Sequence, residues 1–172
     1  SYSLANSFYQ NRLDQVLDET ERAVSSVQNT IAAASLTDEA ALQTLINSVV
    51  PSLEISGGSG ARQVALLRSP GQPQLQLFQS PISRDLDLNS IPDELRISVR
   101  DSTGVLTYTP IQLVRQDQLV PGITVGAPLS IPLAGNFELY LVFDLAAPFS
   151  TVTSVRSPAV TENGVSVTLS SA

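Results

Sequence analysis

The amino-acid sequence predicts an α+β domain in which a long N-terminal helix and short helices pack on an antiparallel sheet. Apolar residues recur at helical spacing through the first third of the chain, and neither Gly nor Pro occurs before Pro51. From Arg62 onward, short runs rich in apolar residues are separated by turns containing Pro and Gly. The run Phe137–Leu145 is apolar on both faces, which is typical of a central strand.

A continuous helix is expected over residues 3–34, as the stem of a region comprising residues 1–34. Its acidic residues and Arg22 fall on the face opposite an apolar stripe. The stripe admits two interpretations, which the sequence leaves open: burial in the core of the domain, or pairing with a second stem in a dimer. Val16 and Ala23 widen the stripe. Its main members follow one another at steps of three or four residues: Leu13, Leu17, Thr20, Val24, Val27 and Ile31.

A second helix is expected over residues 37–50. Thr37 is a favourable N-cap residue, Asp38 and Glu39 would lie in the first turn, and Pro51 is expected to end the helix. A Gly- and Ser-rich run follows at 56–61. It precedes a strand, whereas a phosphate-binding loop of the Rossmann type follows one, so we interpret it as a linker.

The sheet is expected within residues 62–145. Residues 80–90 are polar and interrupted by Pro, and they are expected to form an exposed connection. Five strands are predicted, near residues 63–68, 75–78, 105–114, 123–131 and 137–145.

Pro and Gly residues set the expected limits of these elements. The first two strands would form a hairpin around the turn at 70–73, and a helix is predicted over 92–101, with Pro92 at its start. Pro110 would interrupt its strand, which is expected to lie at an edge of the sheet or to contain a bulge. A turn is expected at Pro121-Gly122.

Composition excludes several classes of site. The 172 residues include 16 Asp and Glu, 9 basic residues that are all Arg, and no His, Lys or Cys, for a net charge of −7. No imidazole or thiolate is available for zinc, haem or iron–sulfur clusters, or for Ser-His-Asp and Cys-His catalysis. The acidic balance argues against a nucleic-acid partner. We therefore expect no cofactor, no metal and no catalytic residue in this chain.

Carboxylates and arginines are the remaining candidates for chemistry. The segment 101–104 (DSTG) approaches an aspartic-protease motif but occurs once, and we interpret it as a turn. The segment 84–89 (RDLDLN) alternates acids but lacks the central Gly and final Glu of a calcium loop. Four arginines could line a pocket for an anion, although surface ion pairs explain them more simply: Arg68, Arg96, Arg100 and Arg115.

Four stretches carry a family resemblance. They are residues 16–23 (VLDETERA), 91–96 (IPDELR) with Val99 and Arg100, 125–129 (VGAPL) and 135–145 (GNFELYLVFDL). In combination they resemble the extracytoplasmic sensor segment of MtrB-type sensor histidine kinases of actinobacteria. The resemblance covers residues 1–155, and the polar stretch 156–172 lies outside it, either as a last strand or as an appended tail.

The resemblance implies a Cache/PDC-like sensor domain that lies outside the cytoplasm between two transmembrane helices of a cell-membrane protein. Such a domain senses an envelope or osmotic stimulus, or the binding of a small ligand or an envelope lipoprotein, and relays this signal to a cytoplasmic kinase. The intact protein would be a histidine kinase whose catalytic part is absent here, and a neighbouring kinase protomer could pair through the stem helix. The alternative is an exported cell-envelope scaffold or adhesion domain without a signalling role.

The membrane arrangement makes a geometric prediction. The stem helix and the strand that ends near Leu145 would each continue into a membrane helix. The beginning of the first and the end of the second must therefore lie on the same side of the domain.

Overall fold

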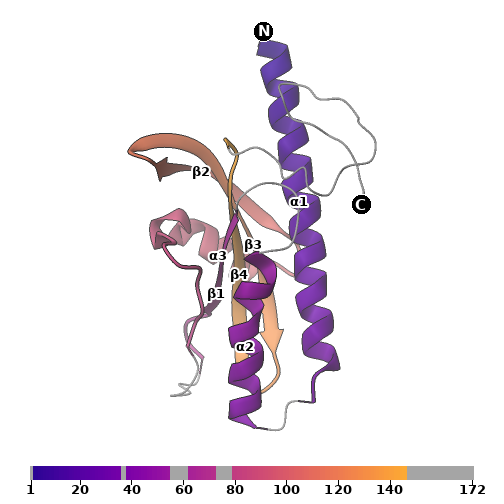
Figure 1. Ribbon diagram of the computed structural model, residues 1–172. Helices are drawn as coiled ribbons and strands as arrows, with labels where there is room; N and C mark the ends of the chain where they lie inside the picture. Colours follow the sequence, from indigo (N-terminus) through magenta and orange to yellow (C-terminus); the bar gives the residue numbers. More distant parts are fainter. Residues whose placement is uncertain (1, 36–37, 55–61, 73–78, 147–172) are drawn as a thin grey trace, which may run out of the picture.

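The computed structural model describes residues 2–35, 38–54, 62–72 and 79–146. Helices α1 (Tyr2–Ala33) and α2 (Glu39–Glu54) pack on one face of a four-stranded antiparallel sheet, and α3 (Asp93–Asp101) covers the other face (Figure 1). This arrangement confirms the predicted α+β class.

The sheet has the strand order β1-β4-β3-β2. All neighbouring strands are antiparallel, and β3 and β4 form a long hairpin in which Ile131 pairs with Gly135. A short 3₁₀ helix, η1 (Leu88–Ser90), precedes α3. The strands are β1 (Arg62–Arg68), β2 (Thr107–Arg115), β3 (Gln118–Ile131) and β4 (Gly135–Asp144).

The apolar stripe of α1 is buried against α2 and the sheet. Val16 and Thr20 are fully buried, and the Thr20 hydroxyl donates a hydrogen bond to the Val16 carbonyl at 2.8 Å. Leu17 is half-buried at the margin of the same core. The domain therefore buries most of the stripe within one chain, as in the first of its two interpretations. The remaining stripe residues in this core are Leu13, Ala23, Val24, Val27 and Ile31.

Helix α2 extends past the end predicted for it. Pro51 lies inside the helix, which continues to Glu54, so the expectation that it ends before Pro51 is wrong. A proline removes one backbone hydrogen bond, but the extra turn buries Leu53 in the core, and Arg62 Nε donates to the Leu53 carbonyl at 2.7 Å. At the other end, Asp38 caps the helix by accepting from the Ala41 N–H at 2.8 Å, and Thr37 lies outside the described residues.

Strand β4 is buried on both faces, as predicted. The side chains of every second residue from Phe137 to Phe143 pack against α1 and α2, whereas Tyr140 and Val142 pack on the α3 side. β1 and β3 pair with its two edges along most of its length. The strand is thus enclosed in all directions.

The β2–β3 hairpin turns at a different place from the one predicted. Gln116 and Asp117 both have positive φ, 53° and 64°, and form the two-residue turn, whereas Pro121 and Gly122 lie within β3. Paired left-handed residues match the twist of a hairpin. Pro110 does not interrupt β2. It lies opposite Ile123 on the edge strand, as expected for proline at a sheet edge.

Two further expectations concern the chain between β1 and α3. The predicted strand at 75–78 lies outside the described residues, and β1 pairs with β4. The connection 80–90 is only partly exposed: Ser83 and Leu86 are buried, and the Ser83 N–H donates to the Val64 carbonyl at 2.8 Å beside β1. Its short polar side chains satisfy backbone groups there, which is why a polar sequence becomes partly buried.

The stripe can be tested with a matched pair of substitutions in α1. Val24→Asp should lower the free energy of unfolding by about 3 kcal/mol because it buries an unpaired charge. Ser25→Asp, one residue further on the exposed side, should change it by less than about 0.5 kcal/mol. Urea denaturation of both variants measures the difference, and equal effects would mean that the buried face of α1 is assigned wrongly.

Candidate functional site

A buried carboxylate lies in the middle of the sheet, on the face covered by α3. Glu138 belongs to β4, between Leu67 of β1 and Pro128 of β3, and its side chain is fully buried. The alternation of the strand turns Phe137 and Leu139 toward α1 and α2, and it turns Glu138 toward α3. A charge at such a position requires partners on the facing helix.

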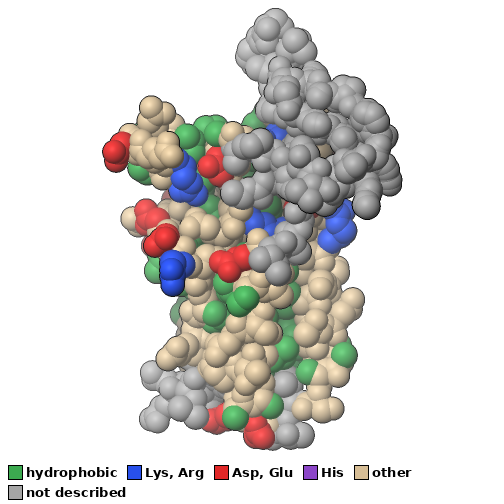
Figure 2. Space-filling model, in the orientation of Figure 1, with side chains coloured by type: hydrophobic (Ala, Val, Ile, Leu, Met, Phe, Trp, Pro, Cys, Tyr) green, Lys and Arg blue, Asp and Glu red, His purple; other side chains and the backbone are tan. Residues whose placement is uncertain are grey.

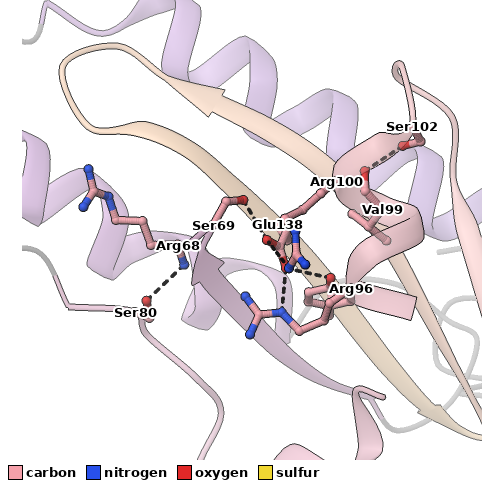
Figure 3. A network of polar contacts seen from close by, with 9 residues as sticks. Arg68, Ser69, Ser80, Arg96, Val99, Arg100, Ser102 and Glu138 are labelled. Carbon is pink, nitrogen blue, oxygen red and sulfur yellow. Dashed lines mark hydrogen bonds and ion pairs between the residues drawn. The ribbon is translucent and has the colours of Figure 1, made fainter. Parts of the chain in front are cut away.

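Four side chains surround the Glu138 carboxylate (Figure 3). Arg96 Nε donates to Oε1 at 2.7 Å and the Tyr140 hydroxyl donates to the same oxygen at 2.9 Å. The Ser69 hydroxyl donates to Oε2 at 2.6 Å, and Arg100 Nη1 lies 3.6 Å from Oε2. The partners come from β4, from the end of β1 and from two successive turns of α3, so the carboxylate ties these three elements together.

The electrostatics of the cluster favour the ionised carboxylate. Burial raises the pKa of Glu138, but the hydrogen bonds from Arg96, Ser69 and Tyr140 and the charge of Arg96 outweigh burial and hold this pKa below its ordinary value. Burial and the adjacent carboxylate raise the pKa of the Tyr140 hydroxyl, so it stays protonated and acts as a donor. A carboxylate occupied by donors in this way is a poor general base, and the cluster serves as an anchor for α3.

Close contact between α3 and the sheet depends on a glycine. A Cβ at Gly126 of β3 would lie 2.5 Å from Tyr140 Cε1 and 2.7 Å from Val99 Cγ2. Any larger residue would displace either the Tyr140 ring or the helix. The glycine thus makes room for the ring whose hydroxyl donates to Glu138.

A second buried charge joins α1 to the end of β4. Arg12 is 3% exposed, and its Nη1 donates to the Leu145 carbonyl at 3.0 Å while Nη2 donates to the Asp144 carbonyl at 3.4 Å. Burial lowers the pKa of Arg12, although the nearby charge of Asp144 opposes this. The Asp144 carboxylate also accepts from the Ala146 N–H at 2.8 Å and pairs with Arg115 Nε at 3.5 Å.

The Arg12 contact places the start of α1 and the end of β4 at the same end of the domain. In Figure 1 the N-terminus of α1 and the C-terminal end of β4 both lie toward the top, and the two elements run in opposite directions. This confirms the geometric prediction for the two ends. Residues 147–172 lie outside the described part of the chain.

The four arginines that were considered as candidates for an anion-binding pocket have different partners. Arg96 and Arg100 share Glu138, and Arg115 pairs with Asp144. Arg68 donates through Nε and Nη2 to the Ala134 carbonyl, at 3.1 and 2.9 Å. The structure therefore brings two of the four together on one carboxylate.

The acidic segments form turns and caps. The Asp87 carboxylate accepts from the Asn89 N–H at 2.9 Å and caps η1, and the Ser102 hydroxyl donates to the Val99 carbonyl at 2.9 Å as the chain leaves α3 toward Gly104. Within the residues that the structure describes, no group of three or more acidic side chains is placed to hold a metal ion. The Gly-rich run at 56–61 lies outside those residues.

The buried, paired positions of Glu138 and Arg12 were not among the predictions from the sequence. Each had a signal: Glu138 interrupts an otherwise apolar strand, and Arg12 lies next to Leu13 and one turn before Val16, on the stripe side of its helix. A charged residue that falls on the buried side of a helix or strand, among apolar residues with the spacing of that element, is expected to be buried and paired. On the face shown in Figure 2, arginines and acidic side chains are interspersed rather than gathered into one basic patch.

The sequence is similar to part of known sensor histidine kinases. No family model matches it. Sensor histidine kinase MtrB of Mycobacterium tuberculosis strain H37Rv is 28% identical over 151 residues, 84% of this chain and 25% of the kinase, and MtrB of Mycobacterium bovis gives the same values. The chain thus spans about a quarter of the length of the curated relatives that it matches.

The solved structures that match this chain include a distantly similar one. It is the ligand-binding domain of the Pseudomonas aeruginosa PAO1 amino acid chemoreceptor PctC in complex with GABA, with a TM-score of 0.39 and 10% identity, covering 84% of this chain and 64% of that chain. The α+β class rests on the arrangement of the helices and strands described above. No helix in the described part of the chain is long and apolar enough to span a membrane.

The Glu138 cluster predicts a pH-dependent stability. Glu138→Gln should lower the free energy of unfolding by about 2–3 kcal/mol at neutral pH, since it removes the partner of two arginines. Because folding lowers the pKa of Glu138, this stabilisation is present above the unfolded pKa of about 4.3 and is lost as the pH falls through the folded pKa. The difference between wild type and variant should therefore shrink on acidification.

Urea denaturation between about pH 7 and about pH 3 measures this difference. Glu94→Gln on the exposed side of α3 is the matched control and should follow the wild type. A gap between wild type and Glu138→Gln that stays constant with pH would contradict the account of the cluster.

Proposed function

We propose that this chain contains the extracytoplasmic signal-input domain of a membrane-bound sensor histidine kinase of the MtrB type, with residues 1–155 as the sensor domain. Similarity to MtrB over most of the chain supports the kinase assignment. The observation that carries the proposal is the common position of the start of α1 and the end of β4, joined by the buried Arg12.

This arrangement suits a domain inserted between two membrane helices. Each end would continue toward the bilayer, and the Arg12 guanidinium, in the first third of α1, bridges this helix to the end of β4. A stimulus that shifts the end of β4 along α1 by about 1–2 Å would move one membrane helix relative to the other. The coupling free energy required is about 1–3 kcal/mol, on the scale of a few hydrogen bonds.

The proposed stimulus is an envelope or osmotic change, a small ligand or an envelope lipoprotein. Catalysis would belong to another part of the kinase, since this chain contains no His that could accept a phosphoryl group. A neighbouring protomer is part of the proposal. Because the apolar stripe of α1 is largely buried in its own domain, contact between two stems would use other residues of α1.

Autophosphorylation of the full-length protein that carries this chain, in membrane vesicles with labelled ATP, tests the proposal. Arg12→Gln should shift the basal level at least about fivefold, because it releases the end of β4 from α1. Arg22→Gln, an exposed arginine on the same helix, should leave that level unchanged.

Two outcomes would contradict the proposal. A full-length protein without ATP-dependent phosphorylation would favour the envelope scaffold or adhesion role. Equal autophosphorylation in wild type and Arg12→Gln would mean that the Arg12 contact plays no part in the relay.

A further inference from the structure

A polar groove of about 500 Å³ opens where the end of α3, the C-terminal half of α1 and the β3–β4 hairpin meet. Phe137 and Leu129 form part of its floor, and its volume is within the range of small-molecule sites, about 300–1,000 Å³. The polar residues that line it, apart from Arg100, carry hydroxyl or amide groups: Gln28, Ser69, Gln72, Ser102, Ser130 and Asn136.

The described residues that line this groove carry positive charge and no negative charge. Arg100 lines it, and none of the described residues that line it is Asp or Glu. This contrasts with the net charge of −7 of the whole chain and with a neighbouring groove along α1 that is lined by Glu21. The groove is therefore a local positive site on an acidic protein.

The Glu138 cluster explains why Arg100 keeps its charge available. A single carboxylate faces two guanidinium groups, so one positive charge is left unbalanced. Arg96 makes the short contact, at 2.7 Å, whereas Arg100 lies 3.6 Å away and its side chain is 30% exposed. Arg100 thus contacts the buried carboxylate (Figure 3) and also lines the groove.

We propose that this groove binds a small monoanionic hydroxy acid, with the ligand carboxylate on Arg100 and the ligand hydroxyls on the surrounding serine and amide side chains. A guanidinium matches a carboxylate in geometry. One unbalanced positive charge matches a monoanion better than a phosphate monoester, whose charge is about −1.5 to −2. A ligand ammonium group would find no carboxylate among the described lining residues.

This binding site goes beyond the proposed function and does not depend on it. The binding site can be tested on the 172-residue chain alone, and the result does not bear on the relay of a signal to a kinase. Absence of binding would leave the kinase assignment standing, and a failed kinase assignment would leave the groove standing.

Gluconate is a suitable probe because it is a monoanion with several hydroxyl groups. Titration of the ¹⁵N-labelled 172-residue protein with sodium gluconate, at ionic strength held constant with sodium chloride, should shift the amide signals of Arg100, Ser102 and Ser130 saturably. Sorbitol supplies the hydroxyls without the carboxylate and should give no saturable shift. Inorganic phosphate should bind more weakly than gluconate.

Two sets of variants test the role of charge. Arg100→Gln should weaken gluconate binding at least about tenfold, whereas Arg84→Gln, an exposed arginine outside the groove, should not. Ser130 is exposed at the groove and does not contact Glu138, so Ser130→Asp adds a repelling charge without disturbing the cluster. Ser130→Asp should abolish binding, and Ser130→Asn should retain it.

Several results would overturn the proposal. They are the absence of a saturable gluconate shift in the folded wild-type protein, equal shifts with sorbitol, tighter binding of phosphate, or equal binding by the Ser130→Asp and Ser130→Asn variants. The Ser130 pair keeps the test decisive even if Arg100→Gln fails to fold.

Discussion

Burial of β4 on both faces and along both edges is the constraint on which the rest of this structure depends. Its aromatic and aliphatic side chains supply much of the core beneath α1 and α2, and Tyr140 and Val142 supply the core beneath α3. Because β1 and β3 both hold its edges from Phe137 to Phe143, this part of β4 has little freedom to shift in the sheet. Its side chains are therefore held in a defined position relative to both helical layers.

The two buried charged residues, Glu138 and Arg12, make their contacts at different points along β4. Glu138, near the start of β4, fixes α3 and the end of β1 through Arg96 and Ser69. Arg12 binds the carbonyl groups where the strand ends and so fixes α1. Each charge is placed where donors or acceptors already converge, which offsets the cost of removing it from water. The strand thus connects the face covered by α3 to the end of the domain at which Arg12 joins it to α1.

Much of the fold could be predicted from the sequence, because hydrophobic period and turn residues act locally. The stripe of α1 and the alternation of β4 identified their elements and their buried faces. Pro51 was wrongly expected to end α2, because the burial of Leu53 in the core outweighs the local preference of proline. Pro121 was wrongly expected to lie in a turn, because the hairpin turns at Gln116 and Asp117 instead. The polar site was harder to predict, since the meeting of Ser69, Arg96 and Glu138 depends on strand order and on the docking of α3.

Arg12 fixes the end of β4 to α1, and a distance between these two elements tests this contact most directly. The chain contains no Cys, so spin labels can be attached through Cys introduced at two exposed positions, Asp18 of α1 and Ala146 beyond β4. Pulsed electron paramagnetic resonance then measures the distance between them. We expect one narrow distribution in the labelled protein and in its Arg22→Gln variant, and a broader one in the Arg12→Gln variant. Equal widths in all three proteins would contradict this expectation.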